Sequence, residues 1–214
     1  MSGIGPRSAQ MLDFAEAYAA EDDLIDVARR VAEEFGLTPI SPATGAALSL
    51  LTAAGSAKAV VEIGTGTGVS GLWLLRGLRP DGVLTTIDVE AEHQRVAKRI
   101  FLEAGYAPSR TRVIAGRGTD VLPRLSDHGY DLLFLDGDRA DYLTCIDEAA
   151  RLLRAGGVLA VNGALVGGRV GDPTARDPYT VAMREVVRTL RDDTKTWRSA
   201  LVPVGDGLLC AARW

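Results

Sequence analysis

A short apolar run followed by three glycines at alternate positions constrains this chain more than any other stretch. The run Val60–Ile63 includes Glu62, and Gly64, Gly66 and Gly68 follow it. Glycine lets the backbone turn sharply and approach a ligand where a Cβ atom would stand in the way. A helical pattern begins directly after Gly68, and a helix N-terminus offers free N–H groups. The stretch therefore predicts a strand, a glycine turn and a helix that form half of a nucleotide-binding crevice.

Strands and helices alternate along the chain from residue 59. Most residues of the expected strands are apolar, and the helices between them carry apolar residues at helical spacing. Continuous apolar strands separated by helices imply a parallel sheet that is covered on both faces. The predicted strands are residues 59–63, 83–88, 111–115, 132–135 and 157–161, and the predicted helices are 69–78, 91–104, 120–125 and 143–153.

The last part of the chain breaks this rhythm. A glycine-rich segment, Gly163–Pro178, precedes a predicted helix around residues 180–190. Two further segments, 199–204 and 207–212, flank a Gly-Asp-Gly turn that is typical of a hairpin. We therefore predict an α/β fold with a doubly wound, mostly parallel sheet, helices on both faces and a terminal antiparallel strand. The glycine-rich segment is either a lid over the site or a flexible connection, and its position after a strand end favours the lid.

The residues before the first strand carry three helical patterns. The clearest start signal is Ser41-Pro42, because serine suits the N-cap and proline suits the first helical position. The length of 214 residues suits one domain. We expect residues 1–214 to form a single domain, with 1–55 as an N-terminal helical extension and 56–214 as the α/β core.

Composition and charge disfavour several classes of protein. The net charge is −4 and there is no long basic run, which disfavours nucleic acid as the main partner. No apolar stretch approaches the length of a membrane span, and the N-terminus lacks the pattern of a signal peptide. Cys145 and Cys210 lie far apart and match no metal or redox spacing. We therefore expect a cytoplasmic protein without a nucleic-acid or membrane partner.

The register of the glycines distinguishes between two kinds of nucleotide. A dinucleotide fingerprint requires G-x-G-x-x-G, whereas here the third glycine comes one position early. Glu62 would repel a pyrophosphate but could accept hydrogen bonds from an ammonium group. Asp88 ends the second predicted strand, where a carboxylate can bind the ribose hydroxyls of either ligand. The pattern favours S-adenosylmethionine, and an NAD-dependent dehydrogenase is the weaker alternative.

Several motifs in combination resemble a known family. The motifs are Glu62-x-Gly64-x-Gly66-x-Gly68, Asp88, Gly116-x-Gly118, Phe134-Leu135-Asp136-Gly137-Asp138 and the upstream segment Thr38–Gly45. They are similar to those of the class I S-adenosylmethionine-dependent methyltransferases, and most closely of the small O-methyltransferases that include the catechol and caffeoyl-CoA enzymes. The resemblance implies a Rossmann-like fold, a small hydroxylated, aromatic substrate and a homodimer.

The resemblance also implies roles for individual residues. Ile40 would contact the methionine or sugar part of the cofactor, Asp88 its ribose and Gly118 its adenine. Asp136 would lie beside the transferred methyl group and the ammonium group. The remaining cofactor-binding residues would surround the methionine end at the glycine turn, and they are Glu62, Gly64, Thr65, Gly66 and Ser70.

The chain departs from the family at the metal site. Metal-dependent members hold a divalent ion with an aspartate that matches Asp136 and with an Asp-Asn pair, which is Asn162-Gly163 here. Magnesium usually requires one or two carboxylates, so we predict no metal site. The catalytic lysine of the family corresponds to Arg139, which cannot act as a base because arginine stays protonated.

We therefore expect a metal-independent O-methyltransferase in which Asp136 and Arg139 are the catalytic residues. Arg139 would orient an anionic substrate or stabilise a phenolate, although a solvated surface position suits it equally well. His128 and Asp138 are further candidates for the general base. Two alternatives remain, namely an S-adenosylmethionine-binding protein that has lost catalysis and a metal-dependent catechol-type enzyme.

Overall fold

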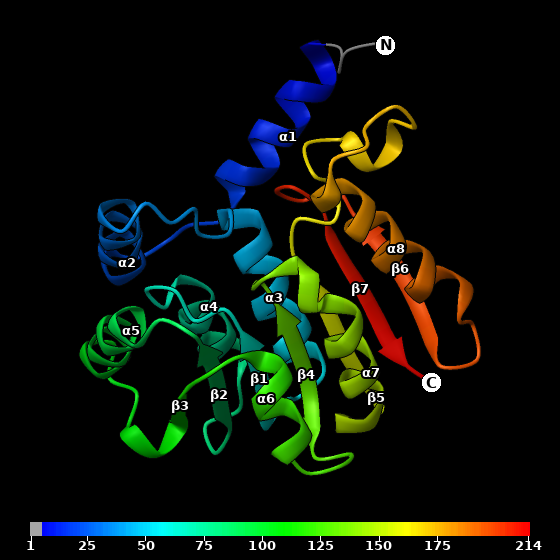
Figure 1. The fold of residues 1–214 in the computed structure, drawn as a ribbon. Helices are drawn as coiled ribbons and strands as arrows, with labels where there is room; N and C mark the ends of the chain where they lie inside the picture. The colour runs from blue at the N-terminus through cyan, green and yellow to red at the C-terminus, as the bar shows by residue number, and fades with distance from the viewer. Residues whose placement is uncertain (1–5) are drawn as a thin grey trace.

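The computed structural model describes residues 6–214, and a seven-stranded sheet runs through its centre (Figure 1). The strand order is β3-β2-β1-β4-β5-β7-β6, and every neighbouring pair is parallel except the two pairs that involve β7. This arrangement confirms the predicted α/β fold, including the antiparallel strand at the end of the chain. The strands are β1 (Ala59–Ile63), β2 (Val83–Asp88), β3 (Thr111–Ala115), β4 (Tyr130–Leu135), β5 (Leu153–Val161), β6 (Trp197–Val202) and β7 (Leu208–Arg213).

Helices cover both faces of the sheet because its strands are apolar on both sides. Val61 and Ile87 point into a core that includes α7 and α8, whereas Val60 and Leu84 point into a core with α3, α4 and α5. The helices on the first face are α6 (Gly118–Val121), α7 (Tyr142–Leu152) and α8 (Pro178–Asp192), and those on the second are α2 (Asp23–Glu34), α3 (Pro42–Ala54), α4 (Val69–Gly77) and α5 (Ala91–Glu103). Four 3₁₀ helices complete the described elements: η1 (Pro108–Arg110), η2 (Leu122–Arg124), η3 (Arg139–Asp141) and η4 (Arg169–Gly171).

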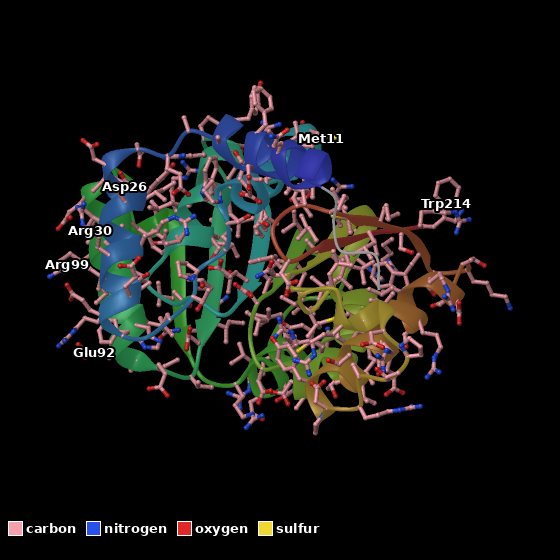
Figure 2. The ribbon with its side chains drawn as sticks, turned by 90° about the horizontal axis from the view of Figure 1, so that it is seen from above. Met11, Asp26, Arg30, Glu92, Arg99 and Trp214 are labelled. Atoms are coloured by element: carbon pink, nitrogen blue, oxygen red, sulfur yellow. The ribbon has the colours of Figure 1, made fainter. Side chains whose placement is uncertain are left out.

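The outer surfaces of α2 and α5 are charged. Figure 2 shows Asp26 and Arg30 of α2, and Glu92 and Arg99 of α5, pointing away from the sheet. The opposite side of each helix is apolar and packs toward the sheet, which is the pattern of a surface helix.

A serine side chain fixes the start of α3, as its sequence predicts. The Ser41 hydroxyl accepts a hydrogen bond from the amide of Thr44 at 3.2 Å, and Pro42 occupies the first helical position. This cap places the preceding residues 37–40 across the carboxyl ends of the strands.

Helix α1 (Pro6–Tyr18) extends away from the rest of the protein (Figure 1). Its Glu16 carboxylate accepts hydrogen bonds from the Ser41 hydroxyl at 3.0 Å, the Ala43 amide at 2.9 Å and the Gly205 amide at 3.0 Å. One side chain therefore ties α1 to both the start of α3 and the turn between β6 and β7. No helix within residues 6–214 is both long and apolar enough to cross a membrane.

Several element boundaries differ from the sequence prediction. Strand β5 begins at Leu153, directly after α7, and so starts earlier than predicted. Its pairing with β4 is irregular at this end, because Tyr130 pairs with Leu153 whereas Leu132 pairs with Val158. The predicted hairpin strands 199–204 and 207–212 are displaced to β6 and β7. The buried Trp197 pairs with Arg213 and so begins β6 earlier than predicted.

Candidate active site

A cavity of about 390 Å³ opens at the carboxyl ends of β1, β2 and β4. Open α/β sheets bind their ligands at this edge, and the volume lies within the range of small-molecule sites. The walls come from the glycine turn, the start of α4, residues 37–40 and the segments that follow β2, β3 and β4. The predicted cofactor-binding residues that line the cavity are Ile40, Gly64, Thr65, Gly66, Ser70, Asp88, Gly118 and Asp136.

Gly64 follows β1 and lies against the backbone of Asp136, which follows β4. Its φ is +97°, and a Cβ atom there would collide with the backbone carbonyl oxygen of Asp136. Its amide donates a hydrogen bond to the Ile87 carbonyl at 2.8 Å. The glycine turn is therefore locked between β2 and the end of β4, and only glycine fits this position.

We expect Gly64→Ala to reduce both stability and cofactor binding. A side chain at positive φ costs about 1–2 kcal/mol, and the collision with Asp136 adds to this cost. Gly167→Ala is a matched control, because Gly167 has a φ of +59° with open space around it. Thermal unfolding and calorimetric titration would measure both effects. Equal losses of affinity in the two variants would contradict the close approach at Gly64.

Asp88 lies where β2 ends, at the edge of the cavity. Its carboxylate accepts hydrogen bonds from the Gly66 amide and the Glu90 amide, both at 2.9 Å. These contacts orient the carboxylate and leave it further lone pairs for ligand hydroxyls. The hydrogen bond from Gly66 to Asp88 therefore holds the glycine turn against the acidic end of β2.

Glu62 differs from its prediction, because it is completely buried beneath the glycine turn and does not line the cavity. The Thr86 hydroxyl donates to Glu62 Oε2 at 2.6 Å, and no described residue bonds to Oε1. Burial raises the pKa of Glu62 to about 8, although the Ser70 and Thr86 hydroxyls favour the ionised form. The structure therefore places this carboxyl group behind the cavity wall, and its contact with a ligand stays a prediction.

A second cavity, of about 580 Å³, adjoins the first at Asp136. The Asn162 side-chain amide donates to Asp136 Oδ1 at 2.8 Å. Burial raises the pKa of Asp136 to about 7, while the Asn162 amide and the positive charge of Arg139 oppose the shift. Asp136 is therefore a carboxyl group that exchanges its proton near neutral pH, at the junction of two cavities.

Arg139 lines the second cavity and has few partners of its own. Its guanidinium carbon lies 3.6 Å from the ring centroid of Tyr179. Within residues 6–214, Arg139 Nε donates no hydrogen bond and the guanidinium forms no salt bridge. A side chain at position 163 would collide with this guanidinium. The structure thus brings Arg139 to the site rather than to a solvated surface.

The donor atoms at this place do not fit a divalent metal. Asp136 is engaged by an amide N–H of Asn162, and Gly163 supplies no side chain. Arg139 brings a positive charge to the position that a third ligand would take. The part of the chain that the structure describes contains no cluster of three histidine, cysteine or acidic side chains with a suitable arrangement.

The two other candidates for the general base lie elsewhere. His128 contacts the Arg213 guanidinium at 3.0 Å and lines neither cavity. Asp138 is exposed and accepts a hydrogen bond from the Ala140 amide at 3.0 Å, so it caps η3 at the rim of the first cavity. Asp136 is the remaining carboxyl group between the two cavities.

The glycine-rich segment does not cover the site. Apart from Gly163, no residue of Gly163–Pro178 lines either cavity. Arg184 of α8 donates hydrogen bonds to the carbonyls of Val170 at 2.9 Å and Ala175 at 2.8 Å, which holds the segment against α8. The geometry therefore gives the predicted lid no support.

Sequence reasoning missed two side chains that reach the cavities. His93 of α5 lines the first cavity and meets the Phe35 ring edge-on, with centroids 5.1 Å apart. Tyr179, at the start of α8, forms part of the second. Both follow helix-start signals in the sequence, but neither signal indicates which cavity the helix will face.

The first cavity fits S-adenosylmethionine by its chemistry. The carboxylate of Asp88 suits ribose hydroxyls, and the close backbone approach at Gly64 leaves room that a Cβ atom would remove. The carboxyl group of Glu62 is buried beneath the turn, where a cationic ligand would favour its ionised form.

Comparisons with known proteins agree with this chemistry. The sequence model of the O-methyltransferase family matches residues 16–214. A protein of Mycobacteroides abscessus that carries the provisional name O-methyltransferase is 53% identical over 203 residues, which span 95% of this chain and 94% of the relative. Among solved structures, the O-methyltransferase TomG of Streptomyces achromogenes, in complex with S-adenosylmethionine, has a TM-score of 0.84 and 30% identity and covers 100% of this chain and 99% of its own. A Corynebacterium glutamicum protein has a TM-score of 0.88 and 35% identity, with 96% of both chains covered.

Proposed function

The chain belongs to the O-methyltransferase family, and we propose that it transfers the methyl group of S-adenosylmethionine to a hydroxyl of a small aromatic molecule without a metal ion. The observation that carries this proposal is the wall that the two cavities share. Residues 38–40 and Asp136-Gly137 line both of them. A ligand in the first cavity can therefore present its reactive end to a second molecule in the other.

The first cavity would hold the cofactor. S-adenosylmethionine supplies a methyl group that its sulfonium already activates, so the protein must mainly align the acceptor, exclude water and manage one proton. We assign Asp88 to the ribose hydroxyls, Gly118 to the adenine, and Thr65 and Ser70 to the methionine end. Ile40 would contact the methionine or sugar part, and Asp136 would lie beside the methyl group.

The second cavity would hold the acceptor between Asp136 and Arg139. We assign Asp136 as the general base, since a pKa of about 7 suits proton transfer at neutral pH. Asp136 would accept the proton of the acceptor hydroxyl, while S-adenosylmethionine would supply its methyl group to the same oxygen and leave as a neutral thioether. Arg139 would stabilise the negative charge that develops on the oxygen, because its Nε donor has no acceptor within residues 6–214.

Turnover is expected to be independent of divalent metal. Methyl transfer to a panel of phenols and catechols, measured with a chelator and again with magnesium, should give the same rates because the donor set does not fit a metal. Strict dependence on magnesium would favour the catechol-type alternative. Binding of S-adenosylhomocysteine without turnover of any acceptor would favour a cofactor-binding protein that has lost catalysis.

We also propose a homodimer. Large apolar side chains of α1 are exposed, with Met11 at 68%, Phe14 at 75% and Tyr18 at 85%, and Trp214 is 78% exposed. Figure 2 labels Met11 and Trp214. Exposed apolar groups on a projecting helix favour association. Light scattering coupled to size-exclusion chromatography should give twice the mass of one chain. Phe14→Glu should lower the measured mass toward that of a single chain. A monomeric native protein would contradict the proposal.

A further inference from the structure

The carboxylate of Glu16 links α1 to two walls of the second cavity. Its Oε1 atom accepts hydrogen bonds from the Ser41 hydroxyl and the Gly205 amide, both at 3.0 Å, and its Oε2 atom accepts one from the Ala43 amide at 2.9 Å. Ser41 and Gly205 line the second cavity, whereas Glu16 lines neither cavity. Glu16 can therefore affect a ligand only through the residues that it holds.

The two walls that Glu16 joins lie against each other. Gly205, in the turn between β6 and β7, has a φ of +54°. A Cβ atom there would lie 2.6 Å from Thr44 Oγ1 and 2.8 Å from Ser41 Oγ. Glycine allows the turn to come this close to the start of α3, and the Glu16 carboxylate bonds to both sides of the contact.

The same turn is also bonded to the segment that follows β5. The Asp206 carboxylate accepts a hydrogen bond from the Gly167 amide at 2.6 Å, and the Asp206 carbonyl accepts one from the Leu165 amide at 2.9 Å. This segment includes Gly163, which lies against the Arg139 guanidinium. The turn is therefore held by the segment after β5 and, through Glu16, by the start of α3.

The charge of Glu16 suits this position because three donors converge on its side chain. A carboxylate has two acceptor oxygens and no hydrogen that would oppose these donors. Ala43 lies in the first turn of α3, where the helix dipole favours a negative charge. A glutamine would have nearly the same shape, but it would turn its N–H groups toward the amide of either Ala43 or Gly205.

We propose that Glu16 is a positioning residue for the acceptor, which holds the start of α3 and the turn between β6 and β7 together and so sets the width of the second cavity. The inference rests on the proposed function, in which this cavity binds the acceptor. The three residues that Glu16 holds are absent from the wall of the first cavity. Loss of the carboxylate should therefore weaken acceptor binding and leave cofactor binding unchanged.

Steady-state kinetics test this role with the most active acceptor of the panel of phenols and catechols. Glu16→Ala should raise KM for the acceptor about 10-fold, as expected for loss of hydrogen bonds to a charged group, and should leave kcat nearly unchanged. Glu16→Gln should have an intermediate KM. Asp13→Ala is the matched control, because Asp13 is an exposed acidic residue on the same helix. Calorimetry should give the native affinity for S-adenosylhomocysteine in all three variants.

The size of the acceptor provides a readout that a merely structural role would not change. Gly205→Ala disturbs the same contact from the other side, because its Cβ atom would push the turn away from α3. In Glu16→Ala and Gly205→Ala, a two-ring phenol such as naphthol should lose less kcat/KM than a one-ring phenol, since it still reaches the displaced wall. Gly105→Ala is the control, because Gly105 has a φ of +81° with open space around it.

Hydrogen exchange tests the link without turnover. In Glu16→Ala, the amides of residues 41–45 and 203–207 should exchange faster than in the native protein, and those of residues 64–68 should not change. Unchanged exchange at both segments would overturn the proposal. So would a native KM for the acceptor, or an equal loss of affinity for the acceptor and for S-adenosylhomocysteine. A native protein that methylates no acceptor would instead contradict the proposed function, and the exchange would still show whether Glu16 holds these walls.

Discussion

Replacing Asp136 by asparagine is expected to lower kcat by about 10²–10⁴-fold, the contribution that a positioned general base usually makes. Asparagine has nearly the same shape and can still hydrogen-bond to Asn162, but it cannot accept the proton of the acceptor hydroxyl. Steady-state kinetics with a phenolic acceptor measure the change. A loss confined to KM would instead assign Asp136 to binding alone.

The pH dependence of the native protein should reveal the same group. A base acts in its ionised form, and burial raises the pKa of Asp136 to about 7. The rate at saturating cofactor should therefore rise about tenfold per pH unit below the inflection and reach a plateau above it. The inflection should lie at pH 7 or below, because a bound cation favours the carboxylate. Asp136→Asn should lose this inflection.

Thermal unfolding separates this loss of activity from a loss of structure. The pKa of Asp136 is higher in the folded protein than the ordinary aspartate value, so ionisation of this group favours unfolding. The associated loss of stability develops as pH rises from about 4 to about 7. At pH 8, Asp136→Asn should therefore have an unchanged or higher Tm. A lower Tm would mean that Asp136 has a structural role.

Replacing Arg139 by methionine is expected to reduce kcat/KM for the acceptor by about 10²–10³-fold, the effect of removing one donor that stabilises a developing oxyanion. Methionine retains much of the length of the side chain and its contact with Tyr179, but it removes the charge and all the N–H donors. The affinity for S-adenosylhomocysteine should not change, because Arg139 does not line the first cavity.

Arg139→Lys tests whether charge alone is sufficient. Lysine keeps a positive charge but lacks the planar fork, and it can lose a proton when desolvated. We expect intermediate activity together with a new dependence on pH. Full activity of Arg139→Met would mean that Arg139 is a surface residue without a catalytic role, which is the alternative that the sequence left open.

The residues that line the first cavity could be predicted from the sequence because their signals are local. Gly64 must be glycine for its backbone conformation, and Asp88 lies at the end of its own strand. Both requirements can be recognised within a few residues. The burial of Glu62 follows from the alternation of side chains along β1. Its side chain points away from the core that holds Val61 and Ile63, and so it lies under the glycine turn.

The acceptor side could not be predicted because it is assembled from distant segments. Arg139 becomes part of a site only because Tyr179 of α8 packs on its guanidinium and Gly163 leaves room for it. The glycine content of Gly163–Pro178 suggested mobility, but Arg184 binds the backbone of that segment. These contacts depend on how α8 docks, which neither spacing nor composition specifies.

The position of β7 has a consequence for the order in which the two cavities are completed during synthesis. Strand β6 is joined to the sheet only through β7, which is the last strand of the chain. The first cavity uses no residue beyond Cys145, whereas the second requires Gly205 and Asp206 in the turn that precedes β7. A nascent chain can therefore form the cofactor side early. The second cavity must await the synthesis of β7 and the turn before it, and until then β5 presents an unpaired edge that is open to aggregation.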